Sequence, residues 1–108
     1  MTVTANQIRM TAACLDERII RTPMLEAPML SRYLGCDIFL KMECLQHTSS
    51  FKARGALNAM LSLSDKQCEN GVITMSAGNH AQAVAYHAER MGIPATIVMP
   101  AQTPFAKV

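Results

Sequence analysis

Lys52 stands where a side-chain amine could act as a nucleophile. Two hydroxyl residues and an aromatic, Ser49, Ser50 and Phe51, precede it, and the residues after it favour a helix. Ser50 can cap that helix by accepting a backbone N–H, which places Lys52 in the first turn. There the helix dipole disfavours a cation and favours the neutral amine. A partly desolvated lysine amine can form a Schiff base with a carbonyl group, although a solvated lysine on a helix surface is the commoner case.

A second segment with chemical potential runs through Ser76, Ala77, Gly78, Asn79 and His80. It follows a short apolar run and precedes a helical pattern. Its small residues, its hydroxyl and its successive backbone N–H groups would therefore lie at a helix N-terminus, where anions bind. The alternative is an ordinary strand-to-helix turn that Asn79 caps, and the loop by itself favours that alternative.

Together the two segments resemble one family of enzymes. Residues 41–56 (KMECLQHTSSFKARGA) resemble the lysine segment of the pyridoxal-phosphate enzymes of the tryptophan-synthase-β type, fold type II, and most of all threonine dehydratase and serine racemase. Residues 76–82 (SAGNHAQ) are similar to the substrate-carboxylate loop of the same family. Two motifs in the family order are far more specific than either alone. The resemblance covers about residues 19–108 and only the N-terminal portion of such an enzyme.

The resemblance implies a role for each residue of the two segments. Lys52 corresponds to the lysine that binds the aldehyde of pyridoxal 5'-phosphate as an imine and later moves protons. Phe51 corresponds to a residue that packs beside the cofactor ring, and Asn79 to one that hydrogen-bonds the ring oxygen. The carboxylate of the amino acid would be held by one loop, formed by Ser76, Ala77, Gly78, Asn79 and His80.

The implied activity is that of a threonine or serine ammonia-lyase, which converts a hydroxy amino acid to a 2-keto acid and ammonia. Ala77 stands where racemase-like members carry a second serine, so the sequence favours a dehydratase. Serine racemase, hydroxyaspartate ammonia-lyase and a non-enzymatic truncated product remain alternatives. Two further departures from the family are Ser49 in place of a frequent glycine and His47 where arginine is common.

The family's glycine-rich phosphate loop and its partner for the pyridine nitrogen would lie beyond Val108. We therefore expect the 108 residues alone to be inactive and to bind the cofactor weakly. A full-length version is expected to form a homo-oligomer.

Hydrophobic spacing predicts an incomplete α/β unit with parallel strands and crossover helices, in keeping with a partial tryptophan-synthase-β-like fold. Residues 1–50 would contribute a helix and a strand to a larger domain, and residues 51–108 would form an incomplete small domain. The predicted helices are 5–18, 28–34, 51–63, 79–91 and one that starts near 103–104. The predicted strands are 37–43, half-buried, 72–75 and 93–99, with an extended link at 22–26 and a polar loop at 64–70. Two strand ends precede the two motifs, so Lys52 and Asn79 should face one crevice.

Composition excludes several other classes of protein. The net charge of +2, without a Lys/Arg cluster, and the absence of tryptophan argue against nucleic-acid binding. No apolar run approaches membrane-spanning length and no signal peptide begins the chain, so a cytoplasmic protein is expected. The histidines form no metal pattern. The cysteines lack C-x-x-C spacing and are expected to be free and buried: Cys14, Cys36, Cys44 and Cys68.

Overall fold

The computed structural model describes residues 2–108. Its helices are α1 (Ala5–Leu15), α2 (Pro28–Leu34), α3 (Lys52–Leu61), α4 (Asp65–Asn70) and α5 (Asn79–Met91). Its strands are β1 (Met24–Glu26), β2 (Phe39–Lys41), β3 (Val72–Met75) and β4 (Ala95–Val98). Three short 3-10 turns complete the elements: η1 (Glu43–Leu45), η2 (His47–Ser49) and η3 (Phe105–Lys107).

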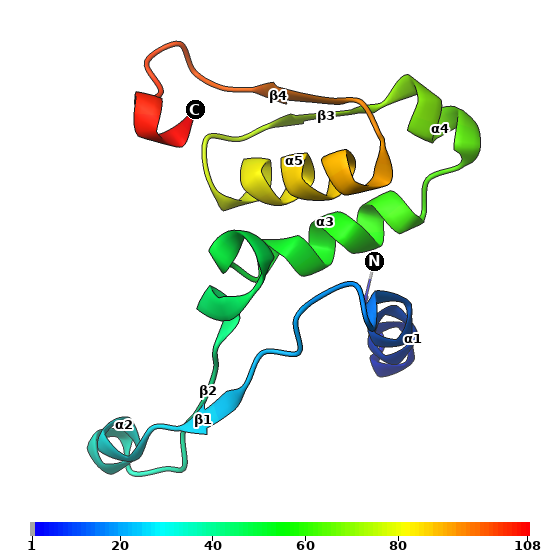
Figure 1. Ribbon diagram of the computed structural model, residues 1–108. Coiled ribbons are helices and arrows are strands. Elements are labelled where there is room, and N and C mark those ends of the chain that lie inside the picture. Colours follow the sequence, from blue (N-terminus) through cyan, green and yellow to red (C-terminus); the bar gives the residue numbers. More distant parts are fainter. Residues whose placement is uncertain (1) are drawn as a thin grey trace.

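The centre of the molecule is a β–α–β unit. Strands β3 and β4 pair in parallel, with Val72 opposite Ala95 and Met75 opposite Val98. Helix α5 makes the crossover between them and lies between the sheet and α3 (Figure 1). The predicted parallel pairing is thereby confirmed, and with it the α/β fold class.

The hydrophobic core fills the space between α3, α5 and the sheet. Its small side chains, chiefly alanines, let the two helices approach closely. The buried members are Ala56, Met60, Ala83, Val84, Ala88 and Ile93. On α3, Ala56, Leu57 and Met60 are buried at helical spacing, whereas Leu63, beyond the end of the helix, is only partly buried.

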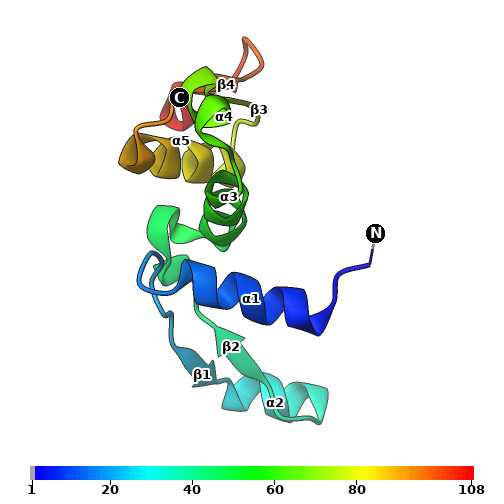
Figure 2. The same ribbon diagram turned by 90° about the vertical axis from the view of Figure 1, so that its right-hand side faces the viewer.

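Helix α1 and an arm formed by β1, α2 and β2 lie below this unit (Figures 1 and 2). The link predicted at residues 22–26 contains β1, which pairs antiparallel with β2. All three residues of β2 are exposed, so the prediction of a half-buried strand over 37–43 is wrong in both length and burial. The alternation of apolar and polar residues there meets no partner surface within residues 2–108.

Helix ends also differ from the predictions. Helix α1 ends at Leu15 rather than residue 18, and Glu17 has a positive φ of 65°. The polar loop predicted at 64–70 is α4, because Ser64 and Gln67 form a capping box in which each side chain bonds the other's backbone N–H. The helix predicted from Thr103–Pro104 is only η3. Strand β4 is shorter than the predicted 93–99.

Much apolar surface is exposed in this arrangement. The radius of gyration is 16.8 Å, against about 13 Å for a compact domain of this length. Strand β3 exposes 74% of Ile73 and 80% of Met75. Three of the free cysteines, Cys14, Cys36 and Cys44, are exposed, so the prediction that the thiols are buried is wrong for them.

Gly71 offers the first prediction. Its φ is 82°, and a Cβ there would lie 2.5 Å from the carbonyl oxygen of Pro94. That oxygen also accepts the N–H of Val72, so it cannot move without disturbing the start of the sheet. We expect Gly71→Ala to lower the free energy of unfolding by roughly 2–4 kcal/mol, measured by urea unfolding. Gly55→Ala, in open space on α3, is the control and should raise it by up to about 1 kcal/mol. Equal effects of the two changes would contradict this account.

Candidate active site

Lys52 lies in the first turn of a helix, as predicted, and α3 begins with it rather than with Phe51. Its Nζ lies 5.1 Å from the centroid of the Phe51 ring, and both side chains are exposed. The predicted cap by Ser50 is wrong: Phe51 occupies the N-cap position, and no side chain caps the helix. The Ser50 hydroxyl is instead buried, with no hydrogen-bond partner among the described residues.

The second predicted segment leads from β3 into α5. Gly78 is the N-cap of this 13-residue helix and Asn79 is its first residue, so the predicted cap by Asn79 is also wrong. The Ser76 N–H donates to the Val98 carbonyl at 3.1 Å, and the Gly78 N–H donates to the Ser76 hydroxyl oxygen at 3.2 Å. Two of the predicted anion-binding amides are therefore engaged within the protein. The Ser76 O–H and the amides at the start of α5 keep donor capacity.

The two segments come together in space. Helices α3 and α5 pack side by side and begin at the same end of the molecule, where β3 also ends (Figures 1 and 2). A cavity of about 210 Å³ between α3, β3 and α5 is lined by residues of both segments, among them Gly55 and His80. That Lys52 and Asn79 face one crevice stays a prediction.

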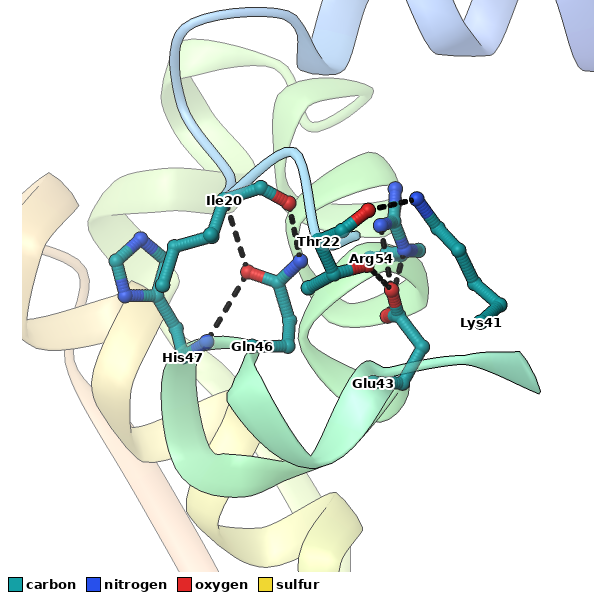
Figure 3. A network of polar contacts seen from close by, with 7 residues as sticks. All are labelled: Ile20, Thr22, Lys41, Glu43, Gln46, His47 and Arg54. Carbon is teal, nitrogen blue, oxygen red and sulfur yellow. Dashed lines mark hydrogen bonds and ion pairs between the residues drawn. The ribbon is translucent and has the colours of Figure 1, made fainter. Parts of the chain in front are cut away.

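A polar network that the sequence analysis did not predict surrounds the start of α3 (Figure 3). Glu43 accepts two hydrogen bonds from Arg54, each 2.7 Å long, from Nε to Oε2 and from Nη2 to Oε1. The buried Thr22 donates its hydroxyl to Glu43 at 2.5 Å, and Lys41 donates to the Thr22 carbonyl at 2.6 Å. Hydrogen bonds from the Arg54 guanidinium lower the pKa of Glu43 to about 2. The network thus ties α3 to the segment before β1.

Gln46 forms the second half of the network. Its side chain, 4% exposed, accepts from the Ile20 N–H at 2.9 Å and donates to the Ile20 carbonyl at 2.8 Å. It also accepts the His47 N–H at 3.0 Å. A buried amide with its hydrogen bonds made in this way fixes both segments that it joins. Spacing alone could not have identified Gln46 or Glu43, because their partners lie far away in sequence.

Backbone strain immediately precedes the lysine. Thr48 and Ser49 have positive φ values of 58° and 53°, a region that L-residues other than Gly, Asn and Asp rarely adopt. Ser49 occupies the position where glycine is frequent in the resembling family, and its left-handed backbone gives the physical reason for that glycine.

Ser49→Gly should therefore stabilise the protein. Relief of left-handed strain exceeds the added entropy of the unfolded chain, so we expect the free energy of unfolding to rise by about 0.5–1 kcal/mol. Ser62→Gly is the matched control, because Ser62 has a right-handed φ of −92°. That change should lower stability in the same urea titration. A loss of stability in Ser49→Gly would show that the strain argument is wrong.

His87 lies beneath the same turn. It is 3% exposed, it packs edge-on against Tyr86, and Tyr86 stacks on His47. Burial lowers the pKa of His87, and the nearby His47 and Arg90 lower it further, while a hydrogen bond with the Ala53 backbone opposes them. The folded protein therefore holds His87 neutral.

This burial predicts a pH dependence of stability. The unfolded chain binds a proton at His87 near pH 6.5, whereas the folded chain does so only at lower pH. The contribution of His87 to the free energy of unfolding is complete above about pH 6.5. It is lost as the pH falls from there through the folded pKa, by at most about 1.4 kcal/mol per pH unit. His87→Phe should flatten the profile of urea midpoints between pH 7.5 and 5. His80→Gln, at an exposed site, should not; an unchanged slope in His87→Phe would contradict the assignment.

Residues 2–108 contain neither a membrane-spanning helix nor a cluster of metal ligands. No helix there is long and apolar enough to cross a membrane. No group of three or more His, Cys, Asp and Glu side chains there is placed to hold a metal ion.

Comparison with known proteins adds four findings. Residues 15–108 match the family described as pyridoxal-phosphate dependent enzyme. The chain is 45% identical to L-threonine ammonia-lyase of Thermotoga maritima over 98% of its own length and 26% of that protein's. It is 47% identical to L-threo-3-hydroxyaspartate ammonia-lyase of Saccharomyces cerevisiae over 87% and 29%. The structure of maize serine racemase matches with a TM-score of 0.90 and 39% identity, over 99% of this chain and 32% of that one.

The parallel β–α–β unit packs against α3, which begins with Lys52, and the loop of residues 76–80 leads into α5. This arrangement defines an α/β module of the fold type II class of pyridoxal-phosphate enzymes. The chain belongs to the pyridoxal-phosphate dependent enzyme family, whose match covers most of its residues. It spans 26% of the length of the Thermotoga maritima protein and 29% of that of the Saccharomyces cerevisiae protein, and it corresponds to their N-terminal portion.

Proposed function

We propose that a protein containing this chain is a pyridoxal-phosphate-dependent ammonia-lyase for threonine or serine. One observation supports the proposal: α3, which begins with Lys52, packs against α5, which follows the predicted anion-binding loop, and the two helices begin at the same end of the molecule. A cytoplasmic, homo-oligomeric enzyme is part of the same proposal.

The residues present fit the cofactor. The Lys52 amine is exposed and has no hydrogen-bond partner among the described residues that would have to be displaced. When bound, pyridoxal phosphate supplies an electron sink for the Cα carbanion of the amino acid. Lys52 would hold the cofactor and move the Cα proton, and Phe51 would pack beside the ring. Asn79 would orient the ring through its amide.

The loop residues would orient the substrate. The Ser76 hydroxyl, which already accepts the Gly78 N–H, can donate its own hydrogen to the substrate carboxylate. The backbone amides of Ala77, Asn79 and His80 would complete the anion site, favoured by the dipole of α5. A carboxylate held by this loop would fix the orientation of the Cα–H bond. A single amine, that of Lys52, could then remove the proton.

Racemisation is the second candidate, because maize serine racemase is a structural match. A racemase needs an acid or base on each face of Cα. Ala77 has no ionisable or hydroxyl group, so the chain offers Lys52 on one side only. This observation favours the lyase. Hydroxyaspartate ammonia-lyase remains a candidate for substrate choice, supported by the 47% identity to the yeast enzyme of that name.

The test uses the longest protein that contains this chain, loaded with pyridoxal phosphate. We expect 2-keto acid and ammonia to form from L-threonine and L-serine, with L-threo-3-hydroxyaspartate assayed in parallel. D-serine should not accumulate from L-serine faster than pyruvate. Rapid D-serine formation, or no keto acid from any of the three substrates, would overturn the proposal.

A further inference from the structure

The strained turn before Lys52 must be held by something else in the molecule. Thr48 and Ser49 are both left-handed, and such strain persists only where surrounding contacts determine the backbone. Gln46 fixes one side of this turn, since its carbonyl accepts the Ser49 N–H at 2.8 Å and its side chain is bonded to Ile20. The other side is α3 itself, beginning with Lys52.

The Glu43–Arg54 pair closes this arrangement across the turn. Glu43 lies five residues before Thr48, and Arg54 lies two residues after Lys52. The pair makes two parallel hydrogen bonds of 2.7 Å, a geometry that restricts orientation as well as distance. Thr22 adds a third bond to the same carboxylate. The Glu43 side chain is 16% exposed and that of Arg54 33%, so the pair is partly shielded from solvent.

We propose that Glu43 and Arg54 are positioning residues for Lys52, which fix the first turn of α3 so that the amine reaches the start of α5. Neither residue touches the reacting atoms. The inference rests on the proposed function, in which Lys52 binds the cofactor aldehyde. The Glu43–Arg54 pair is the one ion pair among residues 2–108, and it joins η1 to the first turn of α3.

The experiment uses the longest protein that contains the chain and three variants: Glu43→Gln, Arg54→Met and the double variant. The first readout is the rate at which pyridoxal phosphate becomes attached to Lys52, trapped with borohydride and located by peptide mass. We expect each single variant to slow attachment about 10- to 100-fold, the effect of a displacement near 1 Å. Since the pair acts as a unit, the double variant should be no slower than the singles. Glu89→Gln and Arg32→Met, at exposed sites, are the matched controls and should match the parent.

A second readout separates positioning from a merely structural role. All variants are compared at temperatures where circular dichroism shows them fully folded, and kcat is measured apart from KM. A positioning role predicts a fall in kcat with KM changed less than about threefold. Folded single variants with attachment rates and kcat within twofold of the parent would overturn the inference. If the parent itself forms no adduct at Lys52, the proposed function fails. Hydrogen exchange then tests whether the Glu43–Arg54 pair fixes the first turn of α3. Faster amide exchange of residues 48–54 in the variants supports this role, and unchanged exchange overturns it.

Discussion

Lys52→Ala is expected to abolish both covalent cofactor attachment and keto-acid formation in any longer protein that contains this chain. Among the other lysines of residues 2–108, Lys41 donates to the Thr22 carbonyl, Lys66 lies on α4 and Lys107 ends η3, so none of them begins α3. The loss should be large, as for other enzymes whose nucleophile is removed, on the order of 10⁴-fold or more in kcat. Borohydride trapping followed by peptide mass, together with a keto-acid assay, measures both effects.

Lys66→Ala is the matched control for that experiment. It removes an exposed lysine and should leave attachment and turnover unchanged. Retained turnover in Lys52→Ala, with the absorbance of a normally loaded protein, would eliminate the role given to Lys52. It would not by itself exclude membership of the family, which depends on the whole matched range.

The 108 residues on their own are expected to show no measurable turnover and only weak binding of pyridoxal phosphate. The family resemblance places the phosphate loop and the pyridine-nitrogen partner beyond Val108, and each lost charge-assisted hydrogen bond weakens binding by about 1.5–3 kcal/mol. Several such losses correspond to at least a 10³-fold weaker affinity. The exposed apolar side chains of Ile73, Met75 and Tyr33 should also drive self-association.

The purified chain can be titrated with pyridoxal phosphate and assayed with threonine and serine, while light scattering follows association. Slow trapping of an adduct at Lys52 is still expected, because attachment needs only the amine and an aldehyde. Turnover near that of a whole dehydratase, lost in Lys52→Ala, would show that the fragment holds the cofactor better than this account allows.

Local signals predicted those parts of the fold that local contacts determine. Helices α2 and α5 end at residues 34 and 91, as predicted, because Gly35 and Gly92 take left-handed conformations there. The parallel pairing of β3 with β4 also followed from the pattern. The capping box of Ser64 and Gln67 is equally local, and it forms α4 where polarity alone predicts a loop. The exposure of β2 could not be predicted from the alternation of apolar and polar residues. Alternation shows that a strand favours a partner surface, but not that such a surface is present.

The candidate site divides in the same way. Lys52 and the loop at 76–80 were predicted because their residue types are unusual and lie next to element ends. The caps assigned to Ser50 and Asn79 were wrong by one position each, since Phe51 and Gly78 take the N-cap positions. The network around Glu43 depends on partners 11 to 26 residues apart, a relation that residue types along the chain do not encode.

The position of the core has a consequence for synthesis of the protein on the ribosome. Every buried member of the core lies between Ala56 and Ile93, and the arm formed by β1, α2 and β2 contributes none. As the chain emerges from its N-terminus, the arm leaves the exit tunnel before the helices it will adjoin exist. Its apolar residues, Leu34 and Phe39 among them, are exposed during synthesis and stay exposed in the folded chain, which favours aggregation throughout. The ion pair that joins η1 to α3 can form only after Arg54 has emerged from the exit tunnel.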